Sequence, residues 1–322
     1  MKNLLLIISI ISIFSIPSVS QEARWYKGNT HTHTTNSDGN ELPRRVVRWY
    51  VDHEYNFLVI TDHDRLTDIK YLDTDKNDDF ILIPGEEVSD RAEGKPVHIN
   101  GIGIKSVVDA RHGETKLETI QNNVDAVIAA GGIPQINHPN WRYSFNDSAL
   151  SKVKNAKLLE VYNVSEENNN YPAGGFPGTE EIWDKTLSRD LLLYGVVSDD
   201  AHDYVGEFTP EKSPPGTGWI MVRAKELTRD AILSALDNGD FYGTNGIYLK
   251  ELNITDREYT IEVDPFRDAK YTIQFIGSYG KTLKEVYGYR ASYRFKGDEK
   301  YVRAKIICSS GDFAITQPVF IK

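Results

Sequence analysis

The sequence predicts an α/β fold over most of its 322 residues, followed by a smaller unit of antiparallel strands. Short apolar runs, typical of buried strands, alternate with segments of helical periodicity up to about Leu249. After Leu249 the apolar residues recur with a period of two, and no helical segment intervenes. Polar residues directly follow several apolar runs, which is where α/β folds place their active sites. These patterns predict a parallel sheet and leave open whether it closes into a barrel.

The strands expected in the α/β part are apolar runs that end in polar or turn residues. The run Phe57-Leu58-Val59-Ile60, which ends in Thr61-Asp62-His63, is the clearest example. The strands, with the residues that end them, are expected at 24–28, 57–60, 81–83, 97–102, 133–139, 158–163, 191–197, 219–222 and 241–246.

Four helices are expected between these strands. The first covers residues 43–51, because Pro43 favours a helix start and Val46 and Tyr50 lie one turn apart. The second covers residues 117–130, where apolar residues keep helical spacing until two glycines follow. The other two are expected at residues 180–188 and 229–236.

The C-terminal region predicts a small antiparallel β unit of sandwich type. Its expected strands lie at residues 259–263, 271–275, 292–295 and 301–307. It contains no histidine, so we expect it to support the rest of the chain or border the site, without supplying chemistry.

The first 20 residues have the pattern of a secretory signal peptide. Lys2 gives a positive start, residues 4–16 are apolar, and small residues precede an expected cleavage after Ser20. An uncleaved anchor is the weaker reading, because the apolar run is shorter than the roughly 20 residues that span a bilayer. We therefore expect an exported protein, periplasmic or secreted, without a stable membrane anchor.

Composition narrows the classes of partner. The formal net charge is −10, and loss of Lys2 with the signal peptide makes it −11. This excess of negative charge disfavours nucleic acid or an anionic membrane as the main partner. It still permits a small anionic substrate held on metal. Cys308 is the only cysteine, so no internal disulfide can form, and we expect it to be a small buried apolar residue.

The segment His31-Thr32-His33 follows the first expected strand and predicts a metal site. Strand geometry turns the two imidazoles to the same face, and Asp38 lies in a polar turn that can bring its carboxylate over them. Imidazole nitrogen and carboxylate oxygen are the usual donors for divalent metals. Taken alone, the segment could equally be a polar loop.

The distribution of all histidines favours the metal interpretation. The chain has 8 histidines, and only His53 and His112 lie away from strand ends. A single histidine at such a position is most often structural, whereas several at equivalent positions of an α/β fold favour one shared metal site. The six at strand ends are His31, His33, His63, His98, His138 and His202.

Residues 24–248 resemble the polymerase and histidinol phosphatase (PHP) family in an ordered set of motifs. The later segments 219–222 and 241–246 look like the CehA/McbA-type branch, which includes carbamate and ester hydrolases beside presumed phosphoesterases. The motifs are His31-Thr-His33 with Asp38-Gly39, Asp62-His63, Glu87, His98, Asn137-His138-Pro139 and Asp200-Ala-His202.

The resemblance implies a distorted (β/α)7 barrel of PHP type over residues 21–248 and a β-sandwich-like accessory domain over residues 249–322. It also implies two or three divalent ions at the C-terminal ends of the barrel strands. The implied ligands are His31, His33 and Asp200 for a first ion, Glu87 as a bridge to a second ion on His98 and His138, and Asp38, His63 and His202 for a third. Glu86 is the neighbour that competes with Glu87, and strand alternation allows only one of the two to face the metals.

The donor set predicts hydrolysis by a metal-bound hydroxide held by His31, His33, Glu87 and Asp200. Mixed nitrogen and oxygen donors suit Zn, Mn or Fe better than Mg or Ca. No serine or cysteine has the setting of a nucleophile. Asp62 and Asp64 are expected to orient ligating imidazoles, with a ligand role as the alternative for Asp64. Substrate contacts are expected from Arg65, Lys95, Trp141 and Asn163, with Arg142 as a further candidate.

The leading functional hypothesis is an exported phosphoesterase acting on small organic phosphomonoesters or phosphodiesters. The alternative is an ester or carbamate hydrolase of the CehA/McbA type, and the third reading is a carbohydrate- or metal-binding module that has lost catalysis. A cationic side chain beside the metals would favour phosphate, whereas an apolar pocket lined by Trp141 and Tyr242 would favour an uncharged ester. The substrate and the oligomeric state stay open.

Overall fold

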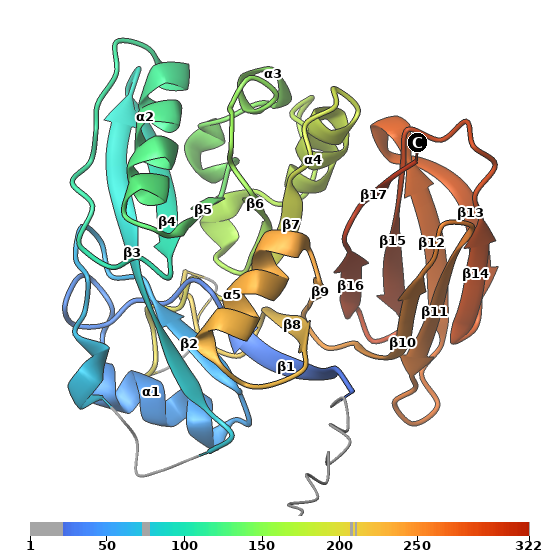
Figure 1. Ribbon diagram of the computed structural model, residues 1–322, viewed down its shortest axis with the longest axis horizontal. Coiled ribbons are helices and arrows are strands. Elements are labelled where there is room, and N and C mark those ends of the chain that lie inside the picture. Colours follow the sequence, from blue (N-terminus) through green and yellow to red (C-terminus); the bar gives the residue numbers. More distant parts are fainter. Residues whose placement is uncertain (1–21, 73–77, 207–208, 210, 322) are drawn as a thin grey trace, which may run out of the picture.

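The computed structural model describes residues 22–72, 78–206, 209 and 211–321. The predicted signal peptide, residues 1–20, lies outside the described residues. Figure 1 shows the α/β part beside a group of C-terminal strands. Strands of both parts pair with one another in a single large sheet. None of the described helices combines the length and the apolar character needed to cross a membrane.

The chain has a mixed α/β fold, and fourteen of the described strands belong to one large sheet. The ladder follows the order β13-β12-β15-β16-β9-β8-β1-β2-β3-β4-β5-β6-β7, with β17 paired to β15. In chain order these strands are β1 (Arg24–Asn29), β2 (Phe57–Ile60), β3 (Ile81–Ala92), β4 (Lys95–Ile102), β5 (Ile133–Ile136), β6 (Leu158–Asn163), β7 (Tyr194–Ser198), β8 (Trp219–Ala224), β9 (Phe241–Thr244), β12 (Tyr271–Gly277), β13 (Lys281–Tyr287), β15 (Tyr301–Cys308), β16 (Phe313–Thr316) and β17 (Val319–Phe320).

The sheet is less parallel than the sequence predicts. Strands β1, β2 and β3 pair in parallel, as do β5, β6 and β7, whereas β3, β4 and β5 pair antiparallel, and so do β1, β8 and β9. A two-residue turn joins β3 to β4 through Glu93 and Gly94, with φ values of 52° and 72°. Two positive φ values are typical of hairpin turns. The expected strand 81–83 is thus much too short, and Glu87 lies inside β3.

Beyond the strand ends, one isolated β-bridge links the β1 side of the sheet to the β7 side. Thr32, after β1, forms a parallel bridge with Ala201, after β7, and the amide of His33 donates to the carbonyl of Ala201 at 2.9 Å. Among the described residues no ladder joins β7 to β8. The closed seven-stranded barrel therefore stays a prediction.

All four predicted helices are present. In α2 (Lys116–Ala129) the side chain of Thr115 accepts from the amide of Glu118, and the Glu118 carboxylate accepts from the amide of Thr115, which fixes the helix start. The other helices are α1 (Pro43–Asp52), α4 (Thr179–Leu187), α5 (Arg229–Asn238) and the short, unpredicted α3 (Asp147–Leu150); the 3-10 turns are η1 (Ile69–Tyr71), η2 (Trp141–Tyr143), η3 (Glu166–Asn168) and η4 (Ser278–Gly280). Helix α2 packs on β3 and β4, and α5 packs on β8 (Figure 1).

The C-terminal strands form a second layer over part of the large sheet. Strands β10 (Tyr248–Ile254), β11 (Glu258–Asp264) and β14 (Arg290–Arg294) make a separate three-stranded antiparallel sheet. Tyr259 and Tyr293 of this sheet contact Phe275 of β12, with ring centroids 5.9 and 5.5 Å apart. The same apolar core extends to α1 and β2. The predicted boundary between residues 248 and 249 falls at the start of β10 and stays a prediction.

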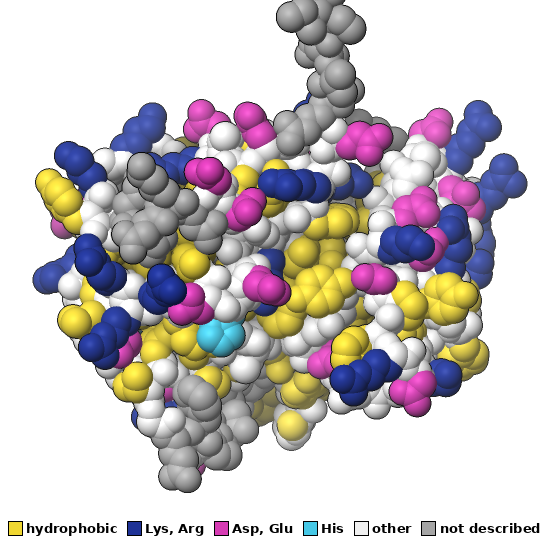
Figure 2. All heavy atoms as spheres, turned by 90° about the horizontal axis from the view of Figure 1, so that it is seen from below, with side chains coloured by type: hydrophobic (Ala, Val, Ile, Leu, Met, Phe, Trp, Pro, Cys, Tyr) yellow, Lys and Arg dark blue, Asp and Glu magenta, His cyan; other side chains and the backbone are white. Residues whose placement is uncertain are grey.

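Charges of both signs are mixed on the surface. Figure 2 shows acidic and basic side chains interspersed over the face seen from below, with hydrophobic side chains gathered near its centre. The acidic net charge is therefore not concentrated in one patch on this face.

Close packing of β1 against β2 makes Gly28 sensitive to substitution. Gly28 pairs with Phe57, and a Cβ atom at Gly28 would lie 2.2 Å from two ring atoms of Phe57, which is fully buried. We expect Gly28→Ala to lower the free energy of unfolding by about 1–3 kcal/mol, measured from the urea midpoint. Because Phe57→Leu removes the ring, the double variant should lose less than the two single variants together. Strict additivity would contradict this account.

Candidate metal centre

The nine predicted ligand residues come together at one end of the α/β part. Most follow the carboxyl ends of strands, while Glu87 and His98 point inward from the β3–β4 hairpin. Their donor atoms form overlapping groups, each compact enough to hold a metal ion. The groups are His31, His33, Glu87 and Asp200; His33, Asp38, His63 and His202; and His63, Glu87 and His98, with His138 against Glu87.

The first group has the spacing of a tetrahedral metal site. Nε2 of His31 lies 3.1 Å from Oε2 of Glu87 and 3.1 Å from Oδ1 of Asp200. Nε2 of His33 lies 3.2 Å and 3.1 Å from the same two oxygens. A divalent ion with tetrahedral bonds of about 2.0–2.1 Å keeps its ligands about 3.3 Å apart. The four atoms therefore surround a space suited to one ion.

Three of these atoms have no hydrogen-bond partner. Nε2 of His31, Nε2 of His33 and Oδ1 of Asp200 are buried and make no hydrogen bond. A buried polar atom without a partner is unfavourable, and several facing one another need a common explanation. A cation between them satisfies all three, so the residues fit a metal ion.

The charge around His31 also favours a cation. Burial opposes a charge on its ring, but Asp200, Glu87 and Glu160 outweigh this and raise the pKa of His31 well above its ordinary value. The same negative field attracts a divalent ion.

Glu87 belongs to two of the groups, the first and the one with His63 and His98. Its Oε2 faces His31 and His33, while its Oε1 lies 3.0 Å from Nδ1 of His98 and 3.2 Å from Nε2 of His138. The amide of Asn137 donates to the same Oε1 at 2.8 Å. This position between two sets of imidazoles suits a bridging carboxylate.

Glu86, the competing neighbour, lies outside all of the candidate groups. Its Oε2 accepts from the amide of Val108 at 2.9 Å, and burial raises the pKa of its carboxyl to about 7. Strand alternation turns it away from the face that carries Glu87.

The outer group is more exposed and is built around Asp38. Nε2 of His63 and Nε2 of His202 each lie 3.4 Å from a carboxylate oxygen of Asp38, whose side chain is 55% exposed. The Nδ1 atoms of the two rings are held by hydrogen bonds, His63 to the Ser89 hydroxyl and His202 to the carbonyl of Asp200, both at 2.7 Å. Both rings thus present Nε2 to the same place.

Glu160 contacts the side of the His31 ring that faces away from the candidate metal position. It was not among the residues predicted from the sequence. Nδ1 of His31 donates to Oε1 of Glu160 at 2.8 Å, which leaves Nε2 of the neutral ring free to bind metal. Oε2 of Glu160 accepts from the amide of His138 at 2.7 Å and from the side chain of Asn163 at 3.0 Å. The sequence feature that could have indicated Glu160 is a single acidic residue inside the apolar run of β6.

Asp62 and Asp64 act on the histidines through intermediate residues. Asp62 accepts from the hydroxyl of Ser37 at 3.0 Å, and Ser37 lies 3.3 Å from Nδ1 of His33. Asp64 accepts from the amide of Ser89, the residue that holds His63.

The predicted substrate residues have different surroundings. Trp141 lines the cavity of about 270 Å³ above the metal groups, with its ring 5.2 Å from those of His98 and His138. Asn163 is buried and donates to Oδ2 of Asp200 at 2.9 Å, so it holds a candidate ligand.

The cationic candidates do not line this cavity. Nζ of Lys95 donates to the carbonyl of Arg142, Arg142 lies over the Trp141 ring, and Arg65 is exposed. Over the described part of the chain, no lysine or arginine belongs to the cavity lining. Tyr242 is fully buried in the core, away from the cavity.

No protein-family model matches the sequence, and no curated protein shows a significant match. The chain is similar in structure to a two-domain protein from Bacteroides vulgatus ATCC 8482, described as containing a predicted PHP-like metal-dependent phosphoesterase. The TM-score is 0.50 at 16% identity, over 93% of this chain and 94% of that one.

Two further structures cover less of the chain. A candidate metal-dependent phosphoesterase from Bifidobacterium adolescentis ATCC 15703 gives a TM-score of 0.37 at 16% identity, over 58% of this chain and 92% of that one. An amidohydrolase from Chromobacterium violaceum, with bound sulfate and no metal, gives 0.38 at 14% identity, over 58% and 93%. The similarity to the Bacteroides structure is one of fold, and it extends over both the α/β part and the C-terminal strands.

The Glu160 contact predicts a loss of metal affinity on substitution. We expect Glu160→Gln to weaken the binding of Zn²⁺ or Mn²⁺ about 10–100-fold, because the ring of His31 loses its anionic acceptor. Titration calorimetry with either metal measures the change. Glu226→Gln, at an exposed position after β8, is the control and should bind like the parent protein. Equal affinity of the Glu160 and Glu226 variants would contradict this role.

Proposed function

We propose that this protein is a metal-dependent hydrolase of small organic phosphate esters, either monoesters or diesters. The observation that carries the proposal is the set of four buried donor atoms, on His31, His33, Glu87 and Asp200, that face one another at 3.1–3.2 Å. The similarity to a structure described as PHP-like adds support at the level of the fold.

Divalent ions at such a centre lower the pKa of water toward neutrality and neutralise charge on the oxygens of a phosphoryl group. The mixed nitrogen and oxygen donors favour Zn, Mn or Fe. The residues of the chain fix the geometry for this chemistry. Glu160 keeps the proton of His31 on Nδ1, while Asn137 and Asn163 orient the carboxylates of Glu87 and Asp200.

The cavity above the centre suits a small substrate. Its volume is about 270 Å³, and the indole of Trp141 forms one wall. Since no described cation lines it, the charge of a phosphate group would be balanced by the metals alone. The same feature keeps an ester or carbamate hydrolase of the CehA/McbA type as the second candidate function.

Three finer features belong to this proposal. They are a distorted (β/α)7 barrel over residues 21–248, a β-sandwich-like accessory domain over residues 249–322, and export to the periplasm or the medium. The barrel is supported by the Thr32–Ala201 bridge, and export is supported by the pattern of residues 1–20 alone.

Hydrolysis of bis-p-nitrophenyl phosphate, p-nitrophenyl phosphate and p-nitrophenyl acetate tests the reaction class. With Mn²⁺ or Zn²⁺ added, we expect turnover of bis-p-nitrophenyl phosphate or p-nitrophenyl phosphate, reduced about a hundredfold or more in His31→Ala because a metal ligand is lost. His112→Ala is the matched control, since His112 is exposed and pairs with Asp90 away from the centre.

The pattern of products separates the candidate functions. Cleavage of p-nitrophenyl acetate alone would replace the phosphate proposal with the ester or carbamate reading. No turnover of any of the three esters, or equal loss in both histidine variants, would contradict the proposal.

A further inference from the structure

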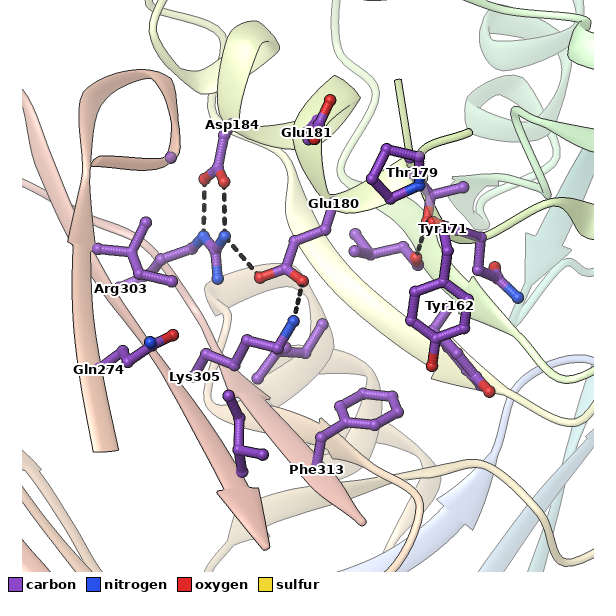
Figure 3. A pocket seen from close by; sticks show the side chains of 18 of the residues that line it. Tyr162, Tyr171, Thr179, Glu180, Glu181, Asp184, Gln274, Arg303, Lys305 and Phe313 are labelled. Carbon is purple, nitrogen blue, oxygen red and sulfur yellow. Dashed lines mark hydrogen bonds and ion pairs between the residues drawn. The ribbon is translucent and has the colours of Figure 1, made fainter. Parts of the chain in front are cut away.

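A second and larger cavity lies between α4 and the C-terminal strands. Its volume is about 660 Å³, and side chains from β6, α4, β12, β15 and β16 line it (Figure 3). It is separate from the metal centre, because strand β6 lies between them. Tyr162 of β6 lines this cavity, whereas Asn163, the next residue, contacts the candidate metal ligand Asp200.

A closed set of ion pairs forms one side of this cavity. The guanidinium of Arg303 is fully buried and donates to both carboxylate oxygens of Asp184, at 2.8 and 2.6 Å. It also donates to Glu180 at 2.8 Å, and Lys305 pairs with the other oxygen of Glu180. Two cations and two carboxylates therefore compensate one another. Of the remaining charged lining residues, Lys185 and Glu181 also balance.

One donor of this set is left without a partner. Nη1 of Arg303 is buried and makes no hydrogen bond. Figure 3 shows this nitrogen directed toward the space between Gln274 and Lys305. A buried donor without an acceptor is unfavourable, so an oxygen atom placed in this space would stabilise the arrangement. Gln274, whose side-chain nitrogen is held by Glu285 at 2.7 Å, supplies a carbonyl oxygen next to it.

Aromatic rings form the opposite side. Tyr162 packs edge-on against Phe313, with centroids 4.8 Å apart, and against Tyr171 at 6.3 Å. Tyr171 is 70% exposed even though its ring borders the cavity. An exposed aromatic ring at the mouth of a cavity with polar groups inside is typical of a binding site for a ligand with an apolar face.

The two sides together define the ligand class. A strong anion is disfavoured, because the buried Arg303 and the partly buried Lys305 are already paired with carboxylates, and the charged lining residues balance overall. A purely apolar ligand would leave Arg303 unsatisfied. A sugar ring presents neutral hydroxyl groups on its edge and C–H groups on its face, which match the donors and the aromatic wall. We propose that this cavity binds a neutral saccharide.

A glycan array probed with the protein in the presence of a chelator tests the proposal. The array carries neutral and acidic saccharides, and removal of metal separates this cavity from the metal centre. We expect retention on neutral glycans, unchanged by the chelator. Retention only on acidic glycans, retention lost on chelation, or no retention on any glycan would overturn the proposal. This outcome does not depend on whether the metal centre hydrolyses phosphate esters.

Variants then locate the binding. For the best neutral glycan, we expect Tyr171→Ala to weaken affinity about tenfold through loss of the stacking surface, measured by titration calorimetry. Gln274→Met, which keeps the size of the side chain and removes the amide, should weaken affinity several-fold. Tyr289→Ala removes a tyrosine that is also exposed but lies outside this cavity, and it should bind normally. Equal affinity of the Tyr171 and Tyr289 variants would place the glycan elsewhere and overturn the proposal.

Discussion

The carboxylate of Glu87 is the group on which the candidate metal centre depends. It is 1% exposed, and its two oxygens face five imidazole rings, which lie on or directly after β1, β2, β4 and β5. Burial raises the pKa of Glu87, but His31, His63 and His98 outweigh this and hold it well below its usual range. The β3–β4 hairpin makes the arrangement possible, because it carries Glu87 and His98 on adjacent antiparallel strands.

The sequence predicted the ligand residues better than the architecture that holds them. Five of the six histidines could be recognised because they directly follow apolar strands at one edge of an α/β sheet, whereas His98, also expected at a strand end, lies inside β4. The hairpin at Glu93 and Gly94 was not predicted, since local apolar runs do not show which strands turn back on themselves. Glu160 was missed because its partner His31 lies 129 residues away. Lys95 lies next to a motif in sequence, but its ammonium group bonds the carbonyl of Arg142 instead of entering the cavity.

Strand β6 lies between the cavity above the metal groups and the larger cavity beside α4. A bulge between Glu160 and Tyr162 interrupts its pairing with β7. As a result Glu160 and Asn163 both turn toward the metal centre, while Tyr162 turns toward the larger cavity. One short strand thus supplies the residue that orients His31 and part of the aromatic wall on its other side. The acidic and basic side chains that line the larger cavity balance one another. The candidate metal centre instead has an excess of buried carboxylates, which a metal cation would neutralise.

Anomalous X-ray diffraction from crystals grown with Mn²⁺ or Zn²⁺ tests the central claim most directly. Data collected at the absorption edge of the metal locate each ion independently of the protein model. The account predicts a peak about 2.0–2.3 Å from Nε2 of His31, Nε2 of His33, Oε2 of Glu87 and Oδ1 of Asp200. No peak there at millimolar metal, with these atoms bonded to water or to one another instead, would contradict it.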